Sequence, residues 1–242
     1  SENTRNDLQR FLSTRPVISE VVYNGLNQQF KPGDPAEARI LLTRQCGIEL
    51  NGGYILHVGG NQWYKNRRGI VEIYDALRSK NNTSLPLLLI GKNPDAELAS
   101  MIASSDFKTD IYCLSNINDE AIKLAYKGAT VFLFPSLAEG FGWPIAEAMA
   151  SGCPVITTDE APMTEVSGDA GFLIARRPFD DEKIKTWAEE SAEIVNQVIN
   201  LSPQERARVI ESGIINARRF NTQESLEKIE AIYTGIFQSY KK

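Results

Sequence analysis

The stretch TVFLFPSLAEGFGWPIAEAMASG, residues 130–152, contains a predicted strand, a loop and a predicted helix in that order. Its first five residues are β-branched or apolar, as in a buried strand. Pro144 suits the first turn of a helix, so we expect a helix over 144–151 that ends before Gly152. The loop 137–143 would then join the carboxyl end of a strand to the amino end of a helix. In open α/β sheets, ligands bind at that place.

The rest of the chain repeats this alternation of short apolar runs and longer helical patterns. Nearly continuous apolar runs are typical of strands buried on both faces of a parallel sheet. The expected strands are 54–58, 86–90, 111–114, 130–134, 154–158 and 171–174, and the expected helices are 35–46, 66–79, 94–104, 119–127, 144–151, 162–167, 182–200, 203–219 and 222–239. The sequence therefore predicts an α/β fold: a doubly wound, mostly parallel, Rossmann-like sheet with helices on both faces.

The beginning of the chain follows a different pattern. A helix near 4–13 and one further strand at 16–23 are expected there, and these two elements are too few to form a core. We therefore interpret residues 1–33 as the tail of a preceding domain plus a linker, and residues 34–242 as the main domain, with a short tail at 240–242.

Composition limits the class of protein. The 242 residues are 42% hydrophobic and 24% charged, with a net charge of −5 and a pI near 5.2, which is typical of a soluble globular domain. The sequence has no basic stripe, so we do not expect nucleic acid to be a main partner. The three cysteines lack disulfide-like or metal-like spacing, which favours a reducing, cytoplasmic location. A single histidine argues against a histidine-built metal centre.

The glycine-rich loop has the chemistry of a phosphate and sugar site. Free N–H groups at a helix start attract a phosphate, and glycines at 140 and 142 let the backbone approach it closely. Glu139 and Glu147 would repel one shared phosphate, whereas an ionised carboxylate accepts hydrogen bonds from two hydroxyls. We therefore expect a diphosphate on the loop and a sugar ring at each glutamate, which is the layout of a nucleotide sugar.

A second element, HVGGNQWYKNRRG at 57–69, also follows a strand and precedes a helix. Gly59 and Gly60 permit a tight turn, and Lys65 places a cation at the same edge of the sheet. A lysine beside a leaving diphosphate stabilises the charge that grows there as the glycosidic bond breaks. No compact acidic cluster is present, so we expect no metal ion.

In order and spacing these segments resemble the C-terminal domain of the retaining family-4 glycosyltransferases, which have the GT-B fold. The resemblance covers nearly the whole chain. It is carried by Ser1–Leu8, Tyr23–Asn27 at the interdomain crossing, Lys65-Asn66, Ser115–Glu120 beside the base, and the Glu139-x7-Glu147 motif with its continuation Ala148–Val155.

The resemblance implies a role for each matching residue. Lys65 and Glu139 would be the catalytic residues, the first holding the donor phosphates and the second the hydroxyls of the transferred sugar. Glu147 would bind the ribose. The nucleotide-sugar-binding set would be Gly60, Lys65, Leu114, Ser115, Ile117, Glu139, Gly140, Phe141, Gly142, Trp143 and Glu147, with Leu114 and its neighbours at the base.

The implied activity is transfer of a hexose from a UDP- or GDP-linked donor to an acceptor, with retention of configuration and without a cofactor or metal. Polysaccharide or glycoconjugate synthesis would be the setting. A missing N-terminal domain would bind the acceptor sugar or lipid-linked glycan, and the full-length enzyme would associate peripherally with the inner face of the membrane. This domain alone would bind donor and transfer little or nothing.

One position departs from the family. An arginine often follows the glycine of the first strand's Val-Gly, and here that position is Gly60. Either Arg67 or Arg68 compensates, or the site relies on Lys65 alone and the two arginines form a solvated helix face. His57 is expected to be an ordinary strand residue with a satisfied hydrogen bond. Two other functions stay open: a non-catalytic nucleotide-sugar-binding domain, and an isomerase or phosphorylase with the same architecture.

Overall fold

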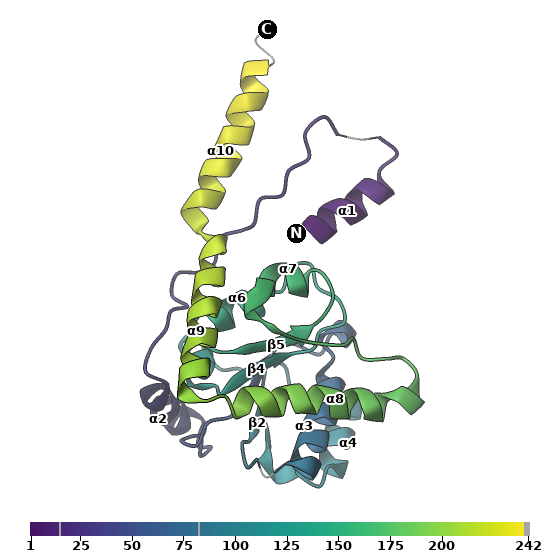
Figure 1. Ribbon diagram of the computed structural model, residues 1–242, viewed down its shortest axis with the longest axis vertical. Helices are drawn as coiled ribbons and strands as arrows, with labels where there is room; N and C mark the ends of the chain where they lie inside the picture. The colour runs from purple at the N-terminus through teal and green to yellow at the C-terminus, as the bar shows by residue number, and fades with distance from the viewer. Residues whose placement is uncertain (15, 82, 240–242) are drawn as a thin grey trace.

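The structure, a computed structural model, describes residues 1–14, 16–81 and 83–239 (Figure 1). Six parallel strands form its sheet in the order β3-β2-β1-β4-β5-β6. The strands are β1 (Ile55–Val58), β2 (Leu87–Ile90), β3 (Ile111–Leu114), β4 (Val131–Phe134), β5 (Val155–Thr158) and β6 (Phe172–Ile174). This arrangement confirms the predicted Rossmann-like α/β fold.

The order in which the chain adds strands to the sheet reverses between β1 and β4. The chain first adds β2 and β3 on one side of β1, then returns to place β4 on the other side, where Ile55 pairs with Val131. The connections that leave the carboxyl ends of β1 and β4 therefore diverge. In doubly wound sheets the crevice between two such connections is the usual ligand site.

Helices cover both faces of the sheet because successive strand residues point to opposite sides. Leu56 and Phe132 belong to one core, and Ile55 and Val131 to the other. The first core is closed by α2 (Pro35–Cys46), α5 (Asp119–Gly128), α6 (Trp143–Ala150), α7 (Met163–Ser167) and α9 (Pro203–Ala217), and the second by α3 (Arg67–Lys80), α4 (Ala96–Ser104) and α8 (Asp181–Ile199). Short 3₁₀ turns lie at Trp63–Lys65, Lys108–Asp110, Gly168–Ala170 and Arg218–Phe220.

The helix starts agree with the capping sequences. The Asp34 carboxylate accepts hydrogen bonds from the N–H groups of Ala36 and Glu37, ahead of Pro35. Ser202 and Glu205 form a reciprocal capping box at the start of α9. These caps satisfy backbone donors that have no partner within the helix, which is why the helix starts could be located in the sequence.

The expected strand at 16–23 is wrong. This segment has no strand partner in the described part of the chain, and Val17 is fully exposed while Ile18 is half exposed. Its apolar pattern resembles a strand, but a strand forms only where a neighbour supplies the ladder of hydrogen bonds. The helix before it, α1 (Glu2–Phe11), is present.

The last helix, α10 (Thr222–Ser239), projects away from the sheet on the side where α1 lies (Figure 1). Apolar side chains on it are exposed, including Leu226, Tyr233 and Phe237. The linker crosses the base of α10, where the Leu26 N–H donates to the Phe220 carbonyl at 2.7 Å. None of the helices described combines the length and the apolar character needed to cross a bilayer. The expected tail at 240–242 lies outside the described residues.

Candidate functional site

Two connections face each other at the switch point between β1 and β4. The Leu137 N–H donates to the Tyr64 carbonyl at 2.7 Å, and the Asn66 amide donates to the Pro135 carbonyl at 2.9 Å. Asn66 is buried, has a positive φ of 52°, and caps α3 by accepting from the Gly69 N–H. Its side chain therefore links the connection that follows β1 to the connection that follows β4. The sequence analysis gave Asn66 no such role.

Lys65 and Glu139 meet where these two connections come together. Lys65 Nζ lies 2.8 Å from Glu139 Oε1, and the two side chains are only 14% and 9% exposed. The ammonium also lies over the rings of Tyr64 and Phe134, at 5.5 and 5.1 Å from their centroids. Contact with ring faces adds electrostatic stabilisation to a cation that has lost much of its water. The two residues predicted to be catalytic are thus brought together.

Glu147 lies one turn inside α6 and close enough to Lys65 to feel its charge. Burial raises the pKa of Glu147, while the hydrogen bond from the Tyr126 hydroxyl and the charge of Lys65 act in the opposite direction. Tyr126 Oη donates to Glu147 Oε2 at 3.0 Å, and burial together with Glu147 raises the pKa of Tyr126 well above its ordinary value. Tyr126 therefore stays protonated and orients the carboxylate. It too was missed in the sequence.

The start of α6 presents a backbone donor. Its N-cap is Gly142, with a φ of 103°, and no side chain caps the helix. Pro144 has no N–H and the Ile145 N–H donates to the Gly142 carbonyl at 3.0 Å, so the Trp143 N–H is the first-turn donor left for a ligand. The partial positive charge of the helix end favours an anion there. Gly140 is exposed, and a Cβ built there would meet nothing within 4 Å.

Phe141 and Trp143 turn their rings into the domain. Their centroids are 4.6 Å apart, and Phe141 also packs edge-on against Phe220 at 5.2 Å and beside Tyr23 at 5.7 Å. These contacts hold the glycine loop against the core of the domain. Gly142 itself is buried, and the expected roles of Phe141, Gly142 and Trp143 in donor binding remain predictions.

His57 lies in β1 beneath the turn at Gly59. It is fully buried, its Nδ1 lies 3.1 Å from the Leu133 carbonyl oxygen, and its Nε2 has no hydrogen-bond partner among the described residues. Burial lowers the pKa of His57 to about 3, so the ring is neutral at physiological pH. The expectation of an ordinary strand residue with a satisfied hydrogen bond holds for only one of the two ring nitrogens.

The two arginines after Lys65 behave differently. Arg67 is buried and donates to the Asn61 side chain and, at 2.8 Å, to the Lys92 carbonyl. Burial lowers the pKa of Arg67. Arg68 is exposed and pairs with Glu97. The solvated-face interpretation is thus wrong for Arg67 and right for Arg68. Among the described residues, no hydrogen bond joins either guanidinium to Lys65 or Glu139. No direct contact therefore supports the idea that Arg67 or Arg68 replaces the arginine that the family often has at the position of Gly60.

The expected base-contact residues lie at the carboxyl end of β3. Leu114 and Ile117 line a surface hollow of about 580 Å³, together with Asn116, Asn118 and the end of α2. Ser115 adjoins this hollow in sequence without lining it. The Gly91 N–H donates to the Leu114 carbonyl at 3.0 Å, and Gly91 in turn packs on the carbonyl of Gly59. The ends of β1, β2 and β3 are therefore adjacent, with the β3 end two strands from β1.

Metal ligands are not grouped in the described part of the chain: no set of three or more His, Cys, Asp or Glu side chains is placed to hold an ion. The expectation of metal-free chemistry remains a prediction.

Comparison with known proteins identifies the family. The profile of the family described as "Glycosyl transferases group 1" matches residues 41–214, which include both connections of the crevice. The chain belongs to the group 1 glycosyl transferases. Among the curated relatives, the Escherichia coli O-antigen chain mannosyltransferase B is 33% identical over 150 residues, which cover 61% of this chain and 39% of the relative.

Solved glycosyltransferases share the fold. The Anabaena protein Alr3699/HepE in complex with UDP and glucose superposes with a TM-score of 0.79 at 19% identity, over 97% of this chain and 62% of that one. The crystal structure of WaaG, a glycosyltransferase involved in lipopolysaccharide biosynthesis, has a TM-score of 0.74 at 21% identity, over 95% of this chain and 60% of that one. At these identities the likeness shows the GT-B fold alone. The chain spans 39% to 62% of these three relatives.

Proposed function

We propose that this chain is the donor-binding part of a retaining glycosyltransferase that transfers a hexose from a UDP- or GDP-linked donor to an acceptor in polysaccharide or glycoconjugate synthesis. The observation that carries the proposal is the Lys65–Glu139 ion pair of 2.8 Å, held largely away from water at the switch point of the sheet. Membership of the group 1 glycosyl transferases supports the reaction class.

The proposed donor lies across the crevice. Its diphosphate occupies the uncapped start of α6, with Lys65 on the opposite connection as counter-charge. Glu147 accepts the ribose hydroxyls, and its orientation by Tyr126 leaves one carboxylate oxygen for that purpose. Leu114, Ser115 and Ile117 contact the base at the end of β3. HepE, which shares this fold, is also solved in complex with UDP-glucose, a donor of the class proposed here.

The chemistry assigned to the chain is electrostatic. In the transfer, the bond between the sugar C1 and the diphosphate oxygen breaks, a bond from C1 to an acceptor hydroxyl oxygen forms, and the hydroxyl proton passes to the leaving diphosphate. Negative charge grows on the leaving diphosphate, where Lys65 and the α6 dipole would stabilise it in a site with little water. Glu139, freed from Lys65 by the incoming phosphates, would accept hydrogen bonds from the sugar hydroxyls. Metal independence and retention follow from the family resemblance and form part of the proposal.

The acceptor is proposed to bind to a preceding domain. Residues 1–33 would be the tail of that domain plus the linker, and residues 34–242 the donor domain. The exposed apolar side chains of α1 and α10, such as Phe11 at 91% and Phe237 at 62%, support a further partner surface on this side. The cytoplasmic, membrane-peripheral location belongs to the same proposal.

Calorimetric titration of the 242-residue chain with UDP, GDP and ADP tests donor binding. We expect UDP or GDP to bind, and Glu147→Ala to weaken that nucleotide about tenfold or more while inorganic diphosphate binds as before, since a charge-assisted hydrogen bond is worth roughly 1.5–3 kcal/mol. The matched control is Glu189→Ala, which removes a surface carboxylate paired with Lys80. No binding of any of the three nucleotides at millimolar concentration would overturn the proposal.

An assay of transfer to acceptor tests the non-catalytic alternative. A binding-only domain would take up the nucleotide sugar and leave it intact when a longer natural chain is supplied with acceptor. Release of free nucleoside diphosphate that requires acceptor supports the transferase, whereas interconversion of the donor without acceptor would indicate an isomerase.

A further inference from the structure

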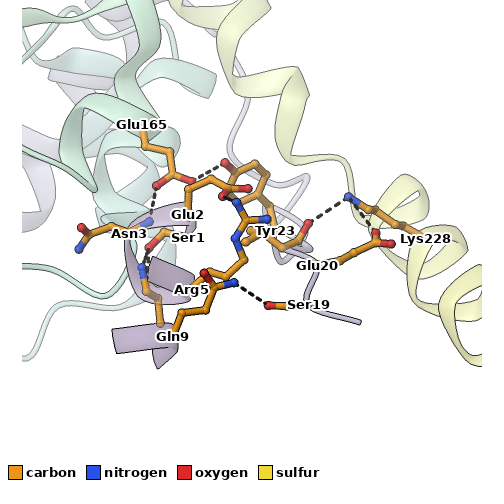
Figure 2. A network of polar contacts seen from close by, with 12 residues as sticks. Ser1, Glu2, Asn3, Arg5, Gln9, Ser19, Glu20, Tyr23, Glu165 and Lys228 are labelled. Carbon is orange, nitrogen blue, oxygen red and sulfur yellow. Dashed lines mark hydrogen bonds and ion pairs between the residues drawn. The ribbon is translucent and has the colours of Figure 1, made fainter. Parts of the chain in front are cut away.

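The N-terminal segment is fastened to α7 through one carboxylate, that of Glu165. Glu165 Oε1 accepts from the Glu2 N–H at 2.7 Å and from the Tyr23 hydroxyl at 2.5 Å, and Oε2 accepts from the Asn3 N–H at 3.5 Å (Figure 2). These contacts span more than 140 residues of sequence. A single side chain thus binds both the first turn of α1 and the linker that follows it.

The same helix start touches the loop that carries Glu139. The hydroxyls of Ser1 and Thr4 donate to the Gly140 carbonyl at 3.2 and 3.3 Å. The ring of Tyr23 packs at 5.7 Å from Phe141, the next residue of the loop. Residues 140 and 141 are therefore in contact with the N-terminal segment on both their backbone and side-chain sides.

Beyond its first turn, α1 has one further polar contact with the linker among the described residues, from the Gln9 amide to the Ser19 hydroxyl at 3.4 Å. None of its residues is buried, and Leu8 and Phe11 on it are more than half exposed. Its described contacts with the domain are the polar ones at its first turn. Contacts of this kind are made and broken more readily than a buried apolar face, because water can replace the partners.

Glu165 is suited to the task because it meets unpaired backbone donors. The first N–H groups of a helix have no partner within it, and a carboxylate there also interacts favourably with the helix dipole. Burial and the bond to Glu165 raise the pKa of Tyr23 to about 12, so its hydroxyl remains a donor at physiological pH. Arg219 donates to the Glu165 carbonyl at 3.3 Å and ties this residue to the end of α9 as well.

We propose that Glu165 is a positioning residue that couples the order of the N-terminal segment to occupancy of the donor site. It fastens α1 and Tyr23 against residues 140–141, so that a ligand held by Glu139 and the α6 start and an ordered N-terminal segment stabilise each other. The coupling rests on the proposed function, whereas the fastening rests on the contacts alone.

Hydrogen exchange of the backbone amides tests the fastening in the 242-residue chain. We expect Glu165→Ala to increase exchange of residues 2–11 by about tenfold, with Glu165→Gln intermediate, because two backbone donors lose a charged acceptor. Glu160→Gln is the matched control, since Glu160 lies five residues earlier and pairs with Arg176 instead. Unchanged exchange in Glu165→Ala would overturn the fastening.

Tyr23→Phe provides a second test that keeps the fold. It retains the ring that packs on Phe141 and Phe220 and removes only the hydroxyl. We expect a smaller increase in exchange, and no further increase when Tyr23→Phe is added to Glu165→Ala. Additive effects in the double variant would overturn the assignment of Tyr23 to Glu165.

Nucleotide titration tests the coupling. In the unaltered chain, saturating UDP or GDP should slow exchange of residues 2–11, and Glu165→Ala should abolish this slowing and weaken nucleotide about three- to tenfold. A variant that loses protection of α1 but binds nucleotide normally would show that Glu165 has a structural role only. Absence of nucleotide binding in the unaltered chain would overturn the proposed function and the coupling with it, while the exchange result without nucleotide would still decide the fastening.

Discussion

Lys65 Nζ and Glu139 Oε1 lie 2.8 Å apart although 74 residues separate them in the sequence. One residue follows β1 and the other follows β4, so the pair bridges the two connections that diverge at the switch point of the sheet. Before a ligand enters, each charge is neutralised by the other. A diphosphate must therefore displace Glu139 from Lys65, and the two residues should respond in opposite ways to substitution.

Lys65→Ala should weaken UDP or GDP about 10- to 100-fold, because a hydrogen bond to a charged group contributes roughly 1.5–3 kcal/mol. Glu139→Ala should leave inorganic diphosphate binding unchanged or stronger, since it removes the carboxylate that competes for the ammonium, and should weaken the nucleotide sugar. Calorimetry on both variants measures this difference. Lys80→Ala breaks a pair of the same 2.8 Å length on the surface and should change neither affinity. Equal losses in the Lys65 and Glu139 variants with inorganic diphosphate would contradict the competition between ligand and carboxylate.

Glu147→Gln should raise stability at pH 7 while it lowers nucleotide affinity. Burial raises the pKa of Glu147, so in its titration window the folded state binds more protons than the unfolded chain, and the free energy of unfolding falls as pH rises through the folded pKa. Removing the charge should therefore stabilise the fold at neutral pH by about 0.5–2 kcal/mol, the usual range for a favourable single substitution. Tyr126 can still donate to the amide oxygen.

The measurement for Glu147→Gln is urea unfolding at pH 7 and pH 5, beside nucleotide titration at both. In the unaltered chain, affinity should fall on acidification because a protonated carboxyl accepts fewer hydroxyl bonds. In Glu147→Gln this part of the pH dependence should be absent. A destabilised variant with normal affinity would refute both the buried charge and the ribose role.

Much of this architecture could be predicted because local signals agree with it. The apolar runs mark strands that are buried on both faces, and Pro144 with Gly142 marks the uncapped start of α6. Lys65, Glu139 and Glu147 could be placed together because the carboxyl ends of parallel strands share one edge of a sheet. Which strands are neighbours at that edge depends on the crossover, and here the order puts β1 beside β4.

Other features depended on tertiary contacts that the sequence does not state. The segment 16–23 has the pattern of a strand but no neighbour to pair with among the described residues. Arg67 and Arg68 are the same residue type at adjacent positions. Only Arg67 is in phase with the buried stripe of α3 that includes Ile70, Tyr74 and Leu77. That 3.6-residue phase was a usable signal for the burial of Arg67. Tyr126 is likewise on the buried side of α5, but its bond to Glu147 depends on how α5 and α6 pack.

Gly140→Ala separates ligand contact from folding. A Cβ at this position meets no protein atom within 4 Å, and its φ lies outside the left-handed region, so stability should change by less than about 0.5 kcal/mol. If the donor lies against the loop backbone as proposed, the methyl group should nevertheless weaken nucleotide-sugar binding about tenfold or more. Gly235→Ala on α10, also in open space, is the control and should leave binding unchanged. Normal binding by Gly140→Ala would move the ligand away from this loop.

His57 should set the acid stability of the domain between pH 6.5 and 4. Because burial lowers its pKa from 6.5 to about 3, the unfolded chain binds one more proton than the folded state in this window, and the free energy of unfolding falls as pH falls. The loss should reach about 1.4 kcal/mol one pH unit below the ordinary histidine pKa, since each unit is worth about 1.36 kcal/mol. His57 is the only histidine in the chain, so His57→Phe should flatten this part of the profile. Phenylalanine can stack beside Phe132 and Phe134 as the imidazole does.

The comparison is made by urea unfolding at pH 7, 6, 5.5 and 5. Ser136→Ala is the matched control, because it also removes a buried polar atom that has no partner but carries no titratable group. It should shift stability by the same amount at every pH. Carboxylates such as Glu147 contribute equally to the unaltered chain and to His57→Phe, so they cancel in the difference between the two curves. Parallel curves for these two proteins would show that His57 is accessible to protons in the folded state.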